Sequence, residues 1–135
     1  MNSKRLFITK DDIFKLTVLY TKDGDLKVAK ETDVLEKEKA NWEKFEIEFS
    51  YPDYGTSKGI MRAATESDRI NIGMLNNALL CSLAKKWNLV DEEEKEIPID
   101  LMKLNELRPD ITRIFVELLQ ERLAKEGLYD AILFS

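Results

Sequence analysis

The 135-residue sequence contains no histidine, one cysteine, three prolines and five glycines. The absence of histidine removes the commonest general base, the commonest metal ligand and every Ser–His or Cys–His nucleophile pair. A single cysteine, Cys81, cannot form an intramolecular disulfide or supply the thiolates of a structural zinc site, and it indicates a reducing compartment. We therefore expect a protein that is not an enzyme, with no catalytic residues, no metal and no cofactor.

Long apolar runs are also missing. Charged residues interrupt every stretch of helix length, and no apolar signal-peptide core follows the basic residues within positions 1–5, so we expect a cytoplasmic protein without a membrane span. The formal net charge is -5, and the basic residues are scattered among acidic ones. Because nucleic-acid-binding proteins usually carry a concentrated basic patch, we expect neither nucleic acid nor a membrane as partner.

The residues that are present suit a packed domain. Hydrophobic residues make up 44% of the chain and charged residues 35%, which is typical of an apolar core beneath a charged surface. The length fits one domain covering residues 1–135.

The first third of the chain has the pattern of β-structure. Residues 13–20 and 26–29 are apolar runs on either side of Asp23-Gly24, which predicts a hairpin because glycine accepts the positive φ of a tight turn. Residues 30–42 predict a loop with a helical turn. Residues 45–51 alternate apolar and polar side chains, which predicts a strand with one buried face. That face carries Phe45, Ile47, Phe49 and Tyr51.

The pattern changes to helical after Pro52. We expect a helix through Ala64 capped by Thr56-Ser57, a longer helix over residues 71–87, and a short one over residues 101–107. A final helix is expected from Pro109 to a stop at Gly127. The predicted fold class is α+β, with an N-terminal β-hairpin or antiparallel sheet (residues 6–52) and a C-terminal part of three to four helices (residues 53–127). The helical residues expected near the strand are Leu75, Leu79, Ile114, Phe115 and Leu118.

Three segments resemble chemical motifs, and each fails on inspection. Residues 55–59 (GTSKG) lack the Lys-Ser/Thr that must follow the second glycine of a phosphate loop, so a turn feeding a helix is the better reading. A calcium loop around Asp23-Gly24-Asp25 is ruled out, because Leu19 and Lys30 would have to occupy its ligand positions. The acidic run over residues 91–96 is predicted to be a solvated loop, and Cys81 a buried, unreactive thiol.

The tail, residues 128–135, is too apolar to lie free in water. It either adds to the domain's own sheet or docks on another chain. We predict that the partner-binding residues lie in this tail and at the edge near Trp87. They are Trp87, Leu128, Tyr129, Ile132, Leu133 and Phe134.

Residues 51–119 contain a series of short elements: a tryptophan that closes one helix, an acidic loop, a proline-bearing segment, and an L-x-x-L turn that leads into Pro109. In this order they resemble tail assembly chaperones encoded in the tail gene clusters of tailed bacteriophages. The matching segments are residues 54–57 (YGTS), 62–65 (RAAT), 75–80 (LNNALL), 87–89 (WNL), 97–99 (IPI) and 104–107 (LNEL).

The resemblance implies a protein that binds tape measure or tail tube subunits in the host cytoplasm during tail morphogenesis. Its partners would be other proteins or further copies of itself, and no small-molecule ligand is expected. Two alternatives remain. In the first, the chain would be a structural virion component of the tail, neck or baseplate. In the second, it would be a small acidic inhibitor or regulator of a host protein.

Overall fold

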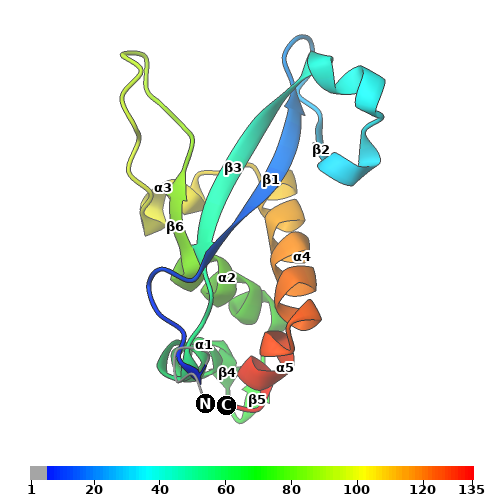
Figure 1. The fold of residues 1–135 in the computed structure, drawn as a ribbon. Helices are drawn as coiled ribbons and strands as arrows, with labels where there is room; N and C mark the ends of the chain where they lie inside the picture. The colour runs from blue at the N-terminus through cyan, green and yellow to red at the C-terminus, as the bar shows by residue number, and fades with distance from the viewer. Residues whose placement is uncertain (1–5) are drawn as a thin grey trace.

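The computed structural model describes residues 6–135, so residues 1–5, which include Lys4 and Arg5, lie outside the described part. Figure 1 shows a four-stranded antiparallel sheet with helices packed against one of its faces. The strands come mainly from the first half of the chain and the helices from the second, which confirms the predicted α+β class.

The sheet has the strand order β2-β1-β3-β6. Its long central strands are β1 (Ile13–Thr21) and β3 (Trp42–Ser50), and its edges are β2 (Val28–Lys30) and β6 (Ala84–Trp87). The predicted hairpin joins β1 to β2, with Gly24 at φ +77° in the connection. Phe45, Ile47 and Phe49 are buried as predicted, because alternate residues of β3 face the helices.

The segment between β2 and β3 contains two short 3₁₀ helices, η2 (Glu31–Asp33) and η3 (Glu36–Asn41), so the expected helical turn is present. Both helices pack near the sheet. Leu19 faces away from the main core, yet it is buried, as is Val34 in this connection.

Helix α1 (Tyr54–Ala64) begins earlier than predicted. Its cap is Asp53, whose Oδ1 accepts from the backbone N–H of Thr56 at 2.7 Å, and not Thr56-Ser57. A small unpredicted hairpin follows, formed by β4 (Thr65–Glu66) and β5 (Arg69–Ile70). Its two turn residues, Ser67 and Asp68, both have positive φ, as a type I′ turn requires.

Helix α2 (Ile72–Leu83) is shorter than the predicted helix over residues 71–87. Asn71 is its cap, and the chain changes directly from helix to strand at Ala84. Strand β6 pairs with the edge of β3, where Trp87 lies opposite Ile47. The open edge of β3 offers hydrogen bonds that outweigh the helical pattern of these four residues.

Helices α3 (Leu101–Asn105) and α4 (Pro109–Lys125) are connected by a short turn. Helix α4 lies against the sheet, where the Phe115 ring meets Phe45 edge-on at 5.2 Å between centroids. Leu75, Leu79, Ile114 and Phe115 are in the core as predicted, but Leu118 is only partly buried. The fully buried positions on the last turns of α4 are Leu119 and Leu123.

The apolar tail forms a further helix, α5 (Leu128–Leu133), after Gly127 at φ +74°. It packs on α1 and α4, and Ile132 is fully buried there. The tail therefore packs on the domain's own helices and does not add to its sheet.

Two arms project from the same end of the molecule in Figure 1. One consists of the β1–β2 connection with η2 and η3. The other, here called the acidic arm, is residues 88–97, which fold back on themselves through the Val90–Glu96 bridge. The acidic arm separates from β3 at Asn88, whose side-chain amide bonds to the Glu46 N–H and the Lys44 carbonyl.

Candidate functional site

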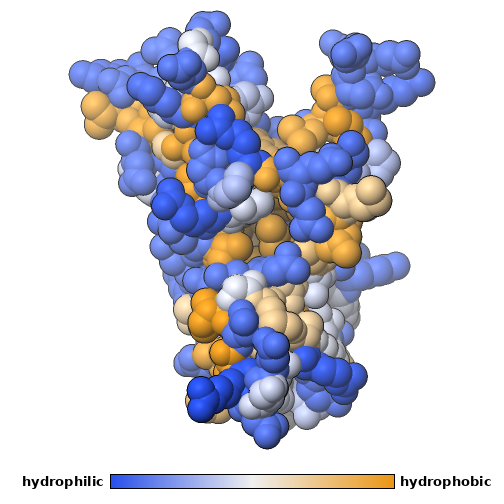
Figure 2. All heavy atoms as spheres, turned by 180° about the vertical axis from the view of Figure 1, so that it is seen from behind, coloured by the Kyte–Doolittle hydropathy of each residue, from blue (hydrophilic) through white to orange (hydrophobic). Residues whose placement is uncertain are grey.

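A groove of about 520 Å³, here called the amide groove, lies between α2, α3 and α4. It lies on the side of α4 that faces away from Phe115 and the sheet, as helical spacing requires. Figure 2 views the molecule from behind, where apolar atoms gather below the two projecting arms. The α4 residues that line the groove are Pro109, Thr112, Arg113, Val116, Glu117 and Gln120.

Helix α2 supplies one wall of the amide groove. Its core residues Leu75 and Leu79 fix the orientation of the helix, so the adjoining positions turn toward α4. Asn71 holds the start of the helix by accepting from the Met74 N–H at 3.0 Å. The wall is formed by Asn76, Asn77 and Leu80.

Helix α3 and the turn after it close one end of the groove. Asp100 caps this helix, its Oδ1 accepting from the Lys103 N–H at 2.8 Å. Pro109 begins α4, where the missing N–H leaves no helical hydrogen bond unmade. The segment contributes Leu104, Asn105 and Leu107, and Leu104 is also part of the core.

One side-chain hydrogen bond crosses the groove. The Gln120 Nε2 donates to the Asn76 Oδ1 at 2.8 Å, which ties α4 to α2. Within residues 6–135 the other amide donors and acceptors of Asn76, Gln120 and Asn105 have no side-chain hydrogen bond in the structure. Asn77 receives only a long contact of 3.5 Å from the Cys81 thiol. The groove thus presents several amide donors and acceptors, beyond those of the Gln120–Asn76 bond, that can bond a ligand.

The two charged residues of the amide groove differ in their pairing. Glu117 bonds to Lys30 of β2, with 3.1 Å between its Oε2 and the Lys30 Nζ. Arg113 is exposed and forms no ion pair with any residue of the described range 6–135. Among residues 6–135, its guanidinium therefore has no acidic partner, in a chain whose formal net charge is -5.

The predicted partner residues do not form one surface. Trp87 is only 4% exposed; its ring packs near Phe45, and its indole N–H donates to the Ile97 carbonyl at 2.6 Å. This argues against the predicted role of Trp87 in partner binding, because a side chain buried to this degree offers little contact area. The indole also connects the acidic arm to the sheet.

Because the tail folds as helix α5, some of its predicted partner residues are buried and others are exposed. Ile132 is fully buried, and its neighbours Leu128, Tyr129 and Leu133 pack partly against the core. Phe134 is 88% exposed and is the one predicted partner residue that stands free in water. Strand β6, which ends at Trp87, and helix α5 lie apart from each other in Figure 1.

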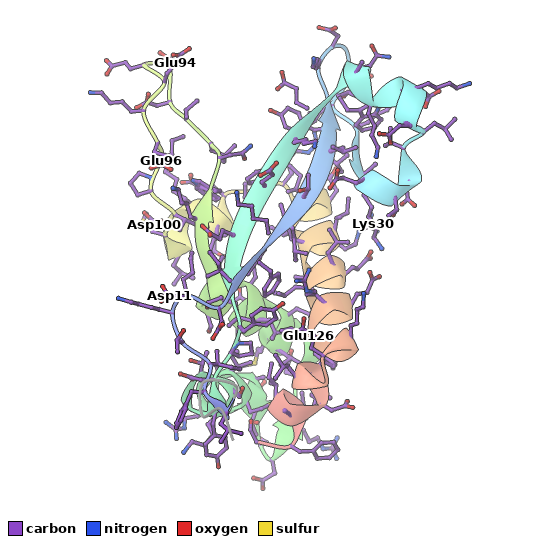
Figure 3. The ribbon with its side chains drawn as sticks, in the orientation of Figure 1. Asp11, Lys30, Glu94, Glu96, Asp100 and Glu126 are labelled. Atoms are coloured by element: carbon purple, nitrogen blue, oxygen red, sulfur yellow. The ribbon has the colours of Figure 1, made fainter. Side chains whose placement is uncertain are left out.

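The acidic arm does not gather its carboxylates. Asp91 Oδ1 accepts from the N–H groups of Glu93 and Lys95, which makes the tip a tight turn. In Figure 3, Glu94 and Glu96 project at different heights along the arm. Across residues 6–135, no cluster of three or more acidic, histidine or cysteine side chains is suited to holding a metal ion.

The other sequence motifs also have structural roles. Residues 55–59 lie inside α1 and form no turn or loop before it, which corrects the expected turn. Cys81 is partly buried, and burial raises the pKa of its thiol. This agrees with an unreactive thiol, although the side chain is less enclosed than predicted.

Sequence reasoning missed the amide groove. Asn76, Asn77 and Leu80 lie within the helix predicted over residues 71–87, and two adjacent amides beside a helix core are a detectable signal of a polar surface there. Gln120 follows Thr112 and Val116 at intervals of four, which places them on one side of α4. The turn through α3 that brings Asn105 to them depends on tertiary packing.

No helix in the described range 6–135 has the length and apolarity needed to cross a membrane. Comparison of the chain with protein-family models, with curated proteins and with solved structures found no match in any of the three.

Proposed function

We propose that this protein binds a segment of another protein in the amide groove, and that it acts as a tail assembly chaperone of a tailed bacteriophage. The observation that carries the proposal is the composition of the groove. Side-chain amides that retain unused donors and acceptors line the groove together with Leu80, Leu107 and Val116, so hydrogen bonds and apolar contacts are available together. Sites of this kind suit recognition of a polypeptide better than a chemical step.

The resemblance to tail chaperones supports the same site. Two of its matching segments, residues 75–80 and 104–107, supply groove residues from α2 and from α3 with its following turn. Those residues are distant in sequence and meet in one concave surface. The proposed clients are tape measure or tail tube subunits, bound in the host cytoplasm before the tail polymerises.

A structural virion subunit is a second candidate because of exposed aromatic residues outside the groove. Phe7, Tyr54 and Phe134 are 68%, 70% and 88% exposed. Tyr54 begins α1 and Phe134 follows α5, and these helices pack together. Large exposed aromatic groups favour permanent contacts with neighbouring subunits.

Site-specific photo-crosslinking tests the proposed function. A photoreactive amino acid at Thr112 would stand in the groove, and one at Lys15 would stand on the open face of the sheet as a control. In cells that naturally produce the chain, we expect Thr112 to capture a tape measure or tail tube subunit and Lys15 to capture neither. Capture of a host enzyme would contradict the chaperone function, and recovery of the chain in purified virions by mass spectrometry would favour the structural subunit.

A further inference from the structure

We infer that the amide groove selects a short extended peptide segment that carries a carboxylate, a ligand class that rests on the proposed protein-binding function. Three features lead to this ligand: the free amides, the length of the groove and the unpaired Arg113. The amides favour an extended segment over the other common occupant of such grooves, an amphipathic helix, while the groove length and Arg113 indicate the size and the charge of the segment.

The amides favour an extended main chain. A helix uses its own main-chain N–H and C=O groups internally, so its middle offers none to a groove. An extended segment leaves one donor and one acceptor free at each residue that is not proline. The Asn105 amide, the Asn76 Nδ2 donor and the Gln120 Oε1 acceptor are not used by the Gln120–Asn76 bond, and they match those main-chain groups.

The groove has room for a short segment of this kind. Along α4 it runs from Pro109 to Gln120, which is roughly 16 Å at the helical rise. That distance corresponds to about five residues of extended chain. Alternate side chains of such a segment point to the same side and would meet Leu80, Leu107 and Val116.

Arg113 supplies the charge selectivity. Its guanidinium has no acidic partner within residues 6–135, whereas Glu117 beside it is already paired with Lys30. A guanidinium binds a carboxylate through two parallel hydrogen bonds, a geometry that a neutral amide cannot reproduce. Because Arg113 is one turn after Pro109, the carboxylate of the bound segment would lie at the end of the groove near α3.

A peptide titration followed by nuclear magnetic resonance tests this inference, since side-chain NH₂ groups give their own signals. The probe is a short peptide of alternating valine and serine with a free C-terminal carboxylate. Its amidated form and an amphipathic helical peptide serve for comparison. We expect the carboxylate peptide to shift the signals of Asn76, Asn77 and Gln120 saturably, and the amidated form to bind about tenfold more weakly.

The Arg113→Ala variant should lose about the same tenfold for the carboxylate peptide and nothing for the amidated one. Arg62→Ala is the matched control, because Arg62 is an exposed helical arginine outside the groove, and it should bind as the unaltered protein does. Equal binding of both peptide forms would overturn the inference. So would groove shifts with the helical peptide alone, or no shift with any peptide at millimolar concentration.

These outcomes are separate from those of the proposed function. A client that presents a helix would still be captured from Thr112 in cells, while the titration would rule out the extended ligand. If Thr112 captures nothing but the carboxylate peptide binds with the expected selectivity, the ligand class stands and the client must be sought elsewhere.

Discussion

At the scale of single residues, Trp87 was predicted from the sequence to contact a partner, but in the structure it stabilises the core. Its ring fills the core beside Phe45, and its indole N–H satisfies the Ile97 carbonyl. Buried tryptophans generally need such a partner for the N–H group. The same side chain therefore contributes apolar burial to the sheet and positions the returning strand of the acidic arm.

Replacing Trp87 separates these two contributions. Trp87→Phe keeps much of the apolar volume but leaves the Ile97 carbonyl without its donor, so we expect a loss of about 1–3 kcal/mol in the free energy of unfolding. Trp87→Ala should cost more, about 3–5 kcal/mol, because it also leaves a cavity. Urea denaturation gives both values. A Trp87→Phe protein as stable as the unaltered one would show that the hydrogen bond contributes nothing.

Cys81 gives a chemical test at the same scale. Burial raises the pKa of its thiol, so less of the reactive thiolate is present at neutral pH. We expect a disulfide reagent to react with the folded protein more slowly than with free cysteine at the same pH, and the rate to rise in denaturant. Equal rates in the folded and unfolded protein would contradict the partly buried environment.

At the scale of elements, helix α5 decides whether the tail belongs to the domain. Ile132 is fully buried and Phe134 is almost fully exposed, although only two positions separate them. Ile132→Ala should reduce the free energy of unfolding by about 2–5 kcal/mol. Phe134→Ala should change it by no more than about 0.5 kcal/mol, as for other exposed positions.

Thermal and urea denaturation of the two variants test this difference. If Ile132→Ala is as stable as Phe134→Ala, α5 does not pack on α1 and α4. If deletion of residues 128–135 leaves a domain that unfolds cooperatively at the original midpoint, the tail is a separate contact segment, as the sequence first suggested.

Elements with strong local signals were predictable. The alternation over residues 45–51 identified the buried face of β3, and Pro109 and Gly127 marked the ends of the region that contains α4. Residues 84–87 were not predictable, because the pattern of Ala84 to Trp87 continues a helix and only the open edge of β3 makes it a strand. The apolar tail was visible in the sequence, but its docking site was not.

At the scale of the whole molecule, the sheet and the helical side differ in what they offer. The open sheet face carries charged side chains such as Lys15, Glu46 and Glu48, whereas the helical side carries the amide groove. The groove was not predictable, since it requires α2, α3 and α4 to meet. In the sequence these residues are separate amides and leucines on different helices, and no local pattern indicates that they meet.

The most direct test of protein binding in the amide groove is the affinity for the crosslinked partner after a bulky charge is placed in the groove. Val116→Arg does this, and Thr17→Arg places the same charge at a half-buried residue of similar size on the opposite face of the sheet. With both variants folded by circular dichroism, calorimetry should show at least about a tenfold weaker affinity for Val116→Arg and no change for Thr17→Arg. Equal affinities of the two variants would contradict binding in the groove.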